Sequence, residues 1–260
     1  MENIDQSIEI RNVNKSFYTG NGEILPVLRD ISFKISSDSF TTLIGPNGCG
    51  KTTLLRIIAG LDVPDSGDVI VKGSKNSSIQ VGYVWQNYRS SLLPWFDVGE
   101  NVAFPLRLHG VERQSRRQIA GKLVDEFMPG ISLKDRTYQL SGGQQQLVSV
   151  LRSLVVEPDV LLLDEPFSAL DQERRWVMGS YVEKAWLKIS VPIVFVSHDV
   201  DEAVLLADSI LLMSRRSGKI DKELKNPLPR PRSQNMLTAK EHLTCRSEIL
   251  DFLFDEEKGF

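Results

Sequence analysis

The segment with the clearest chemical meaning is a glycine-rich stretch that ends in lysine and threonine. It fits the pattern G-x-x-x-x-G-K-[ST] and consists of Gly45, Pro46, Asn47, Gly48, Cys49, Gly50, Lys51 and Thr52. Glycines let successive backbone N–H groups converge on phosphate oxygens, and the following helix adds the partial positive charge of its N-terminus. We expect Lys51 to reach the β and γ phosphates and Thr52 to offer its hydroxyl to Mg²⁺, while Cys49 has only to be small. The pattern therefore predicts a site for a nucleoside triphosphate.

Two adjacent carboxylates follow an apolar strand later in the chain. Val160 to Leu163 is an uninterrupted apolar run, and Asp164 and Glu165 come directly after it. Phosphoryl transfer to water needs charge neutralisation and a group that orients or deprotonates the water. We assign Mg²⁺ binding to Asp164 and the activation of water to Glu165. A strand that ends in a solvated acidic turn is the alternative, and the phosphate loop favours the catalytic interpretation.

A histidine occupies the same place at the end of another strand. The apolar run Ile193 to Val196 is followed by Ser197 and His198, and ligands bind at the C-terminal edge of such sheets. His198 is therefore the candidate contact to the γ-phosphate, against the alternative of a structural histidine. Asp199 and Glu202 are predicted to be the N-cap of the next helix and its N3 partner.

A second glycine-containing segment opens another predicted helix. It precedes the helical pattern from Gln145 to Val156 and consists of Leu140, Ser141, Gly142, Gly143 and Gln144. A serine hydroxyl and free N–H groups at a helix N-terminus can bind an anion. An ordinary serine-capped helix start explains the segment equally well when the segment is considered alone.

The remaining pattern places these motifs on a mixed framework of strands and helices. Ile8 to Ile10 and Ile31 to Ile35 alternate apolar and polar residues, with a turn at Gly20 to Gly22 between them, which predicts an antiparallel layer. The unbroken apolar runs before the acidic pair and the histidine predict parallel strands covered on both faces. Between about Gln86 and Glu157 the pattern becomes helical and interrupted by prolines, so we expect an inserted helical subdomain.

These patterns divide the chain into four segments. The antiparallel layer and the first part of the core occupy residues 1–85, the helical subdomain 86–157 and the second part of the core 158–214. We interpret residues 215–260 as an appendage. It begins with a basic, proline-broken stretch up to Arg232 and finishes with a short amphipathic end around Ile249 to Phe254.

Composition limits the classes of function. The 260 residues carry 31 Lys and Arg against 34 Asp and Glu, a net charge of −3, so no strong positive field is available to attract nucleic acid. Cys49 and Cys245 are too few for a disulfide framework and are interpreted as free thiols in a reducing cytoplasm. The first residues do not resemble a secretory leader, and no apolar run approaches the ~20 residues that span a bilayer. We expect a protein that is neither secreted nor membrane-spanning.

Taken together, the order and separations of the motifs resemble those of ATP-binding cassette ATPases from about Ile8 to Ser214. The matching positions are Gly45 to Thr53, Gln86, Leu140 to Gln144, Asp164, Glu165, Ser168 to Asp171 and His198. The resemblance implies an α/β fold with a P-loop NTPase (RecA-like) core, an antiparallel β subdomain and an inserted α-helical subdomain. It also implies that the chain binds ATP and Mg²⁺ and hydrolyses the ATP.

The resemblance further assigns roles across a dimer. In such ATPases the signature segment, here around Ser141 and Gly143, completes the ATP site of the other subunit, so a monomer is catalytically incomplete. Phe17 is implied to stack on adenine, with a core position as its alternative. Gln86 is implied to sense Mg²⁺ and water and to report to the membrane subunits, and Asp171 to make a contact across the dimer.

The signature segment departs from the family pattern just after Gln144. Gln145 and Leu147 stand at positions usually held by arginines, whereas Arg152 keeps its basic residue. The loss of two positive charges is a reason to expect weaker contacts to the signature loop and the partner. It is also a reason to expect hydrolysis that is low or that depends on a less altered partner ATPase.

The resemblance favours the energy-coupling subunit of a solute importer, bound at the cytoplasmic face of the membrane. The implied partners are a second cassette subunit, identical or different, the transmembrane permease subunits and, indirectly, a solute-binding protein. Residues Trp85 to Trp95 and Pro227 to Arg232 resemble the branch that imports nitrate, sulfonate, taurine and bicarbonate. A soluble cassette ATPase of DNA repair or translation would need a long coiled-coil insertion or two cassettes. A switch GTPase would need an Asn-Lys-x-Asp motif, which Asn14 to Phe17 does not match.

One apolar cluster indicates where the membrane partner binds. Within five positions the chain carries Leu92, Leu93, Trp95 and Phe96. Pro94 argues against a continuous helix through them, and packing inside the helical subdomain is the alternative explanation. The resemblance implies a groove here for a cytoplasmic helix of the transmembrane subunit. We expect Trp95 or Phe96, with neighbours near Glu100 and Asn101, to contact it.

Overall fold

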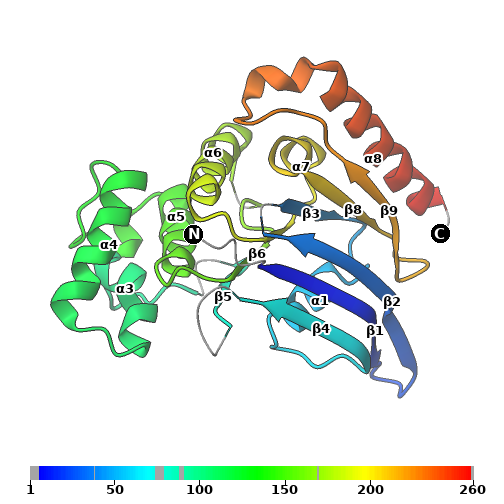
Figure 1. The fold of residues 1–260 in the computed structure, drawn as a ribbon, viewed down its shortest axis with the longest axis horizontal. Coiled ribbons are helices and arrows are strands. Elements are labelled where there is room, and N and C mark those ends of the chain that lie inside the picture. Colours follow the sequence, from blue (N-terminus) through cyan, green and yellow to red (C-terminus); the bar gives the residue numbers. More distant parts are fainter. Residues whose placement is uncertain (1–5, 38, 74–78, 88–90, 169, 259–260) are drawn as a thin grey trace.

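The N-terminal third of the chain forms a small antiparallel sheet beside the main body. The computed structural model describes residues 6–37, 39–73, 79–87, 91–168 and 170–258; the first five residues, Tyr88 to Ser90 and Ala169 of the sequence predictions lie outside them. Strands β1 (Ser7–Tyr18), β2 (Ile24–Ser36) and β4 (Ser66–Lys72) pair in the order β2-β1-β4, all antiparallel. The predicted antiparallel layer is therefore confirmed (Figure 1).

The main sheet carries the predicted parallel strands. Its order is β5-β6-β7-β3-β8-β9, with the bounds β3 (Phe40–Ile44), β5 (Val81–Val84), β6 (Val160–Asp164), β7 (Ile193–Val196), β8 (Ser209–Met213) and β9 (Ile220–Lys225). The first five run parallel, and β9 pairs antiparallel with β8. Strands β3, β6, β7 and β8 are buried at every position, which explains the unbroken apolar runs of β6 and β7.

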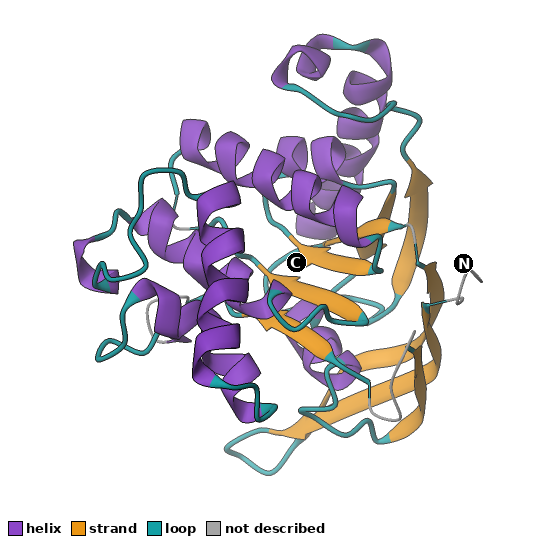
Figure 2. Ribbon diagram, turned by 60° about the vertical axis from the view of Figure 1, so that its left-hand side comes forward, coloured by secondary structure: helices purple, strands orange, loops and turns teal. Residues whose placement is uncertain are grey.

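Helices cover both faces of the main sheet. Helix α1 (Lys51–Ile58) packs between the two sheets, where its Leu54 and Leu55 join Ile8 of β1 and Leu162 of β6 in one apolar cluster. On the other face, α6 (Gln172–Ile189) packs through Trp186 on Phe40, whose ring in turn contacts Phe195. Helix α7 (Val200–Leu206) contacts α6 and β3. Figure 2 shows helices on both sides of the parallel strands.

The inserted helical lobe stands at one side of the sheet (Figure 1). It comprises α3 (Val98–Leu108), α4 (Arg113–Phe127), the short helix η1 (Thr137–Gln139) and α5 (Gly142–Leu154). The predicted break at Pro94 is confirmed, because α3 begins only at Val98 with Asp97 as its N-cap. Asn101 is fully buried, and its amide binds the backbone of Leu93 and the carbonyl of Phe96. Asn101 itself is therefore committed to fixing this loop, and the contact predicted for its neighbourhood stays a prediction.

The C-terminal segment adds β9, the short helix η2 (Gln234–Thr238) and α8 (Lys240–Lys258), which packs on α7. The helix is longer than the short amphipathic end that the sequence indicates. Arg230 lies 4.3 Å from the ring of Trp186 and pairs with the Asp208 carboxylate at 2.9 Å. The side chain of Arg232, 2% exposed, reaches the same carboxylate at 3.0 Å. Arg232 is thus a buried and Arg230 a partly buried ion-pair partner of the body, while the division of the chain at residue 214 stays a prediction.

No helix in the described part of the chain has the length and apolar character needed to cross a membrane.

Candidate active site

The phosphate loop joins β3 to α1, and its conformation requires glycine at two positions. Gly50 is the N-cap of α1 at φ +104°, in the left-handed region that glycine tolerates best. A Cβ at Gly45 would come within 2.2 Å of the backbone oxygen of Met213. The Lys51 ammonium donates to the carbonyls of Gly45 and Pro46 at 2.8 and 3.1 Å, so it sits over the loop that is predicted to hold phosphates.

The carboxylate of Asp164 lies directly beside this loop. It ends β6, and its Oδ1 accepts a hydrogen bond from the Thr52 hydroxyl at 3.1 Å. Its Oδ2 accepts one from the Tyr83 hydroxyl, also at 3.1 Å. Burial raises the pKa of Asp164, whereas these two hydrogen bonds lower it. Tyr83 was missed by sequence reasoning; its only signal is its place in the short strand β5 just before Gln86.

Glu165 adopts a strained backbone conformation at the end of the same strand. Its φ is +44°, which is uncommon for a residue with a side chain and costs on the order of 1–3 kcal/mol. Its carboxylate accepts a hydrogen bond from Gln86 Nε2 at 2.8 Å and lies 3.5 Å from His198 Nδ1. The structure thus brings two predicted site residues, Gln86 and His198, from separate segments of the sequence to the carboxylate of a third, Glu165.

The turn that carries His198 is held by the start of α7. His198 itself is half exposed, but Ser197 before it is buried. Asp199 caps α7 by accepting the N–H of Glu202 at 3.0 Å, as predicted. The reciprocal half of the prediction is wrong, because the Glu202 side chain does not return to the cap backbone. It binds the Ser197 hydroxyl instead.

The signature segment lies on α5, away from the phosphate loop. Ser141 caps the helix, accepting the N–H of Gln144 at 3.4 Å, and the Gln144 side chain accepts the N–H of Ser141 at 2.8 Å. Helix α5 contacts α3, α6 and β5, whereas α1 contacts β4, β6 and β7. The serine and the phosphate loop therefore belong to separate parts of one subunit, which is the arrangement that a site shared between two subunits requires.

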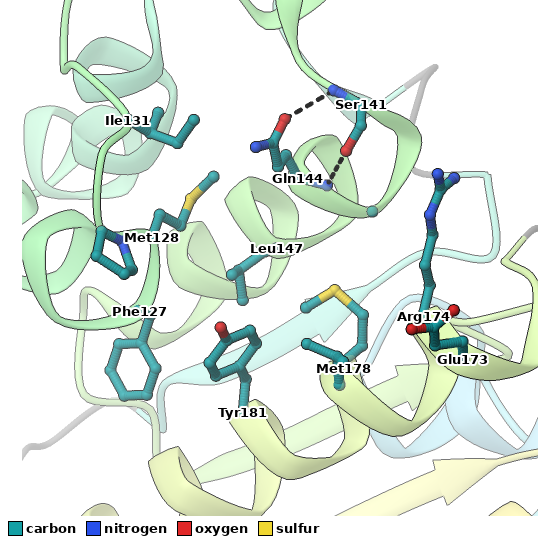
Figure 3. Close-up of a pocket in the computed structure, with 13 residues that line it drawn as sticks. Phe127, Met128, Ile131, Ser141, Gln144, Leu147, Glu173, Arg174, Met178 and Tyr181 are labelled. Carbon is teal, nitrogen blue, oxygen red and sulfur yellow. Dashed lines mark hydrogen bonds between the residues drawn. The ribbon is translucent and has the colours of Figure 1, made fainter.

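The two positions that depart from the family pattern have different surroundings. Gln145 donates its amide to the carbonyl of Leu140 at 3.1 Å. Leu147 is buried and lines a pocket of about 400 Å³ with Phe127, Met178 and Tyr181. Figure 3 shows this apolar wall below the Ser141–Gln144 pair. Leucine is therefore matched to its surroundings at position 147.

Two predicted contact residues lie at the surface. Phe17, in β1, is 42% exposed, so it does not belong to the core, and the Lys15 ammonium lies 5.5 Å from its ring centroid. Asp171 is the N-cap of α6 and also pairs with Arg174 at 3.3 Å. Both are placed where a nucleotide or a second subunit can reach them.

The oxygen donors beside the phosphate loop suit a magnesium ion. The Thr52 hydroxyl and the Asp164 carboxylate are 3.1 Å apart, and Gln86 uses its amide nitrogen toward Glu165, which keeps its oxygen as a further donor atom. Mg²⁺ prefers such hard oxygen ligands and is commonly held by one or two carboxylates together with substrate phosphates. The residues present therefore fit the ion.

A phosphate loop between strand and helix, with an acidic pair and a histidine on neighbouring parallel strands, defines a P-loop nucleotide hydrolase. Among P-loop nucleotide hydrolases, a second glycine segment such as the one at the start of α5 distinguishes the ATP-binding cassette class. Comparison of the sequence gives the particular family: residues 28–168 match the ABC transporter family, and the chain belongs to it. Membership makes ATP the nucleotide and the chain an ATPase.

Similar proteins support this assignment over most of the chain. An uncharacterized ABC transporter ATP-binding protein of Methanocaldococcus jannaschii is 41% identical, covering 96% of this chain and 92% of that protein. The aliphatic sulfonates import ATP-binding protein SsuB of Bacillus cereus is 39% identical, with 88% and 90% covered. The nitrate import ATP-binding protein NrtD of Synechocystis is 38% identical, with 85% and 83% covered.

The fold is also that of a solved cassette. The dimeric structure of a post-hydrolysis state of an ATP-binding cassette bound to ADP and Pi superposes with a TM-score of 0.71 at 28% identity. It covers 84% of this chain and 98% of that one. The predicted α/β class with a P-loop core is therefore confirmed.

Proposed function

We propose that the chain hydrolyses MgATP at sites shared between two cassettes and thereby drives import of a small anionic solute. The observation that carries the catalytic part is the cluster around Glu165, where Gln86 and His198 approach one carboxylate at 2.8 and 3.5 Å. The loop lysine and the Thr52–Asp164 pair lie beside it. This cluster supplies every group that phosphoryl transfer to water needs from one subunit.

Each residue of the cluster has a distinct role in hydrolysis. Lys51 exchanges its bonds to the loop carbonyls for bonds to the β and γ phosphates. Glu165 takes the proton of the attacking water, which Gln86 orients, and His198 donates a hydrogen bond to a γ-phosphate oxygen. Mg²⁺, when bound by Thr52, Asp164 and Gln86, neutralises charge that develops on the phosphates. The Tyr83 hydroxyl fixes the direction of the Asp164 carboxylate.

The second subunit completes each site through its signature segment. Ser141 and the N–H groups of Gly142 and Gly143 stand at the N-terminus of α5, where they can receive the γ-phosphate held by the partner's Lys51. The dimer found in the similar solved cassette supports this assembly. The proposal holds for a partner that is a second copy of this chain and for one that is a different cassette.

The membrane partner is proposed to bind beside the loop before α3. Trp95 is 66% exposed and packs edge-on against Phe96, with ring centroids 6.2 Å apart. Phe96 and Phe104 line a small groove with the guanidinium groups of Arg107 and Arg113. An exposed tryptophan packed on a half-buried phenylalanine, next to a polar rim, is typical of a docking site for a helix. Binding there places the chain at the cytoplasmic face of the membrane.

The class of solute is inferred from the relatives. Proteins named for import of aliphatic sulfonates, taurine and nitrate are 39%, 35% and 38% identical to this chain. All three solutes carry an oxyanion group, so a small oxyanion received from a solute-binding protein is the proposed cargo. The import names of these relatives count against the alternative of a soluble cassette in DNA repair or translation.

Substitution of the proposed base tests the catalytic proposal. Glu165→Gln keeps an oxygen acceptor for Gln86, so ATP should still bind through Lys51 and the loop amides, while hydrolysis should fall by at least about a hundredfold. A dimer stalled on ATP should accumulate. The exposed Glu157, three residues before β6 begins, provides the control as Glu157→Gln. Hydrolysis by Glu165→Gln within about threefold of the parent, a barrier change below ~1 kcal/mol, would exclude Glu165 as the principal base.

A further inference from the structure

The turn that presents His198 is held by a buried side chain that the mechanism above does not use. Ser197 Oγ accepts the N–H of Asp199 at 3.0 Å, across His198. The same hydroxyl donates to Glu202 Oε2, one turn along α7. Its distance to the carbonyl oxygen of Asp199 is 3.3 Å, so a second acceptor is within reach. The Ser197 proton can therefore be directed either to Glu202 or to the Asp199 carbonyl.

Glu202 is an unusual partner for this turn because only one of its oxygens is satisfied. The residue is 7% exposed, and its Oε1 has no hydrogen-bond partner among the described residues. It borders a cavity of about 280 Å³ that is also lined by Arg175, Glu183 and Arg232. A buried carboxylate oxygen without a donor is costly when the group is ionised and much less so when it is neutral.

The charged groups around Glu202 do not cancel this cost. Arg175 of α6 is bound to Asp199 at 2.8 Å and to the carbonyl of Leu170 at 2.9 Å. Arg232 is engaged with Asp208, and Glu183 with Arg230. Of the remaining charges, Asp199 and Glu165 are both negative and raise the pKa of Glu202, whereas Arg175 lowers it.

The two protonation states of Glu202 give two hydrogen-bond arrangements of the turn. When Glu202 is neutral, its O–H can donate to Ser197 Oγ, and the Ser197 hydroxyl can then donate to the carbonyl of Asp199. The turn is then closed by two bonds between Ser197 and Asp199, and Glu202 carries no buried charge. When Glu202 is ionised, the Ser197 proton is drawn to the carboxylate and the bond to the Asp199 carbonyl is lost. A hydroxyl has two acceptor lone pairs and one proton, so both arrangements are chemically complete for Ser197.

We propose that Glu202 is a positioning residue for His198, acting through Ser197, and that hydrolysis is fastest when Glu202 carries its proton. The proposal rests on the γ-phosphate role given to His198 under the proposed function. Because Arg175 also binds the Leu170 carbonyl next to Asp171, the same network links the His198 turn to the predicted dimer contact.

The direction of the pH effect follows from burial. Burial raises the pKa of Glu202 from 4.5 to about 7. Near neutral pH the turn therefore changes from the arrangement with two Ser197–Asp199 bonds to the one in which the Ser197 hydroxyl donates to ionised Glu202. Hydrolysis by the parent should therefore decline as pH rises through this range. The decline should be larger than any pH-dependent change shown by Glu202→Gln, which cannot ionise at position 202.

The test compares the parent chain with Glu202→Gln, which keeps the size and hydrogen-bonding capacity of the neutral acid. The full-length, nucleotide-free chain has three histidines, so the His198 imidazole resonances can be assigned by substitution and followed by NMR against pH. We expect the parent to show an inflection that Glu202→Gln lacks. Asp201→Asn, one residue earlier on α7 and paired with Arg246, is the matched control and should keep it.

Hydrolysis supplies the second readout. The ratio of the parent rate to the Glu202→Gln rate should be near one at pH 6 and fall at least threefold by pH 8.5. Ser197→Ala removes the connecting hydroxyl and should abolish the extra His198 inflection even though Glu202 remains.

Each outcome decides. Identical His198 titrations in parent and Glu202→Gln overturn the proposal, as does an inflection that survives in Ser197→Ala, since the effect then does not pass through Ser197. If Glu202→Gln does not fold, Ser197→Ala alone decides by the same criterion. Because the NMR measurement needs no nucleotide, it can succeed even if the catalytic proposal for Glu165 fails.

Discussion

The stability of the chain should depend on pH through one buried carboxyl. Glu202 has an ordinary pKa of 4.5 when unfolded and about 7 in the folded chain. Each pKa unit of difference corresponds to ~1.4 kcal/mol, so keeping this side chain ionised and buried costs about 3 kcal/mol well above neutral pH. That is a large part of the ~5–15 kcal/mol by which domains are usually stable. Glu202→Gln should remove this cost.

The sign is fixed by which state holds the proton. Between the two pKa values the folded chain keeps the Glu202 proton and the unfolded chain has released it. The contribution of this group to the free energy of unfolding is therefore full at low pH and is lost as pH rises from about 4.5 to about 7. The stability advantage of Glu202→Gln should grow by about 2.5 kcal/mol between pH 5 and pH 8.

Urea unfolding followed by far-ultraviolet circular dichroism measures this advantage. The parent, Glu202→Gln and Asp201→Asn are unfolded at both pH values, and equal slopes against urea show that the unfolded states are comparable. Other titrating groups cancel in the difference between parent and variant. An advantage that is the same at pH 5 and pH 8, to within about 0.5 kcal/mol, would refute the reasoning that Glu202 is buried without compensation.

Three further predictions concern the dimer, the membrane partner and the altered signature helix. If the chain pairs with itself, mixing Lys51→Ala and Ser141→Ala subunits should leave one intact and one doubly damaged site; nucleotide crosslinking that places Ser141 at the ATP of its own subunit contradicts this. Alanine at Trp95 or Phe96 should uncouple transport from hydrolysis in the assembled transporter while the isolated chain binds ATP normally, and unchanged assembly and transport in both variants rules out the contact. Leu147→Arg should lower the free energy of unfolding by at least ~1 kcal/mol, because it replaces a buried leucine beside Phe127, Met178 and Tyr181 with a guanidinium; chemical unfolding that shows a gain instead would mean that the pocket accepts the charge.

Much of the site could be predicted because its key residues sit at fixed distances along the sequence. The phosphate loop needs only eight consecutive residues, and Asp164 and Glu165 follow a strand whose apolar run is visible on its own. Parallel strands end at the same edge, so placing the acidic pair near His198 required only the assignment of two strands. The structure confirms those strands and brings the side chains together.

The residues that escaped prediction act through contacts that are remote in sequence. Tyr83 reaches Asp164 across 81 positions, and nothing around it in the sequence distinguishes it from a strand residue. Glu202 fits an N3 capping position so well that its contact with Ser197 was hidden. Arg230 and Arg232 belong to the basic stretch that was interpreted from the sequence as part of an appendage, whereas the Asp208 carboxylate, 22 and 24 positions before them, ties both to the body.

The order of strands in the main sheet has a consequence for synthesis of the chain. Strand β3, which delivers the phosphate loop, lies between β7 and β8, and β7 is translated about 150 residues after β3. At the ~5–20 residues per second typical of translation, the loop waits roughly ten to thirty seconds for its neighbours. During that time the apolar residues of β3 have no partner strand. The nucleotide site therefore cannot form on the nascent chain until most of the chain has left the ribosome. During this interval β3 can be bound by chaperones that recognise extended apolar segments.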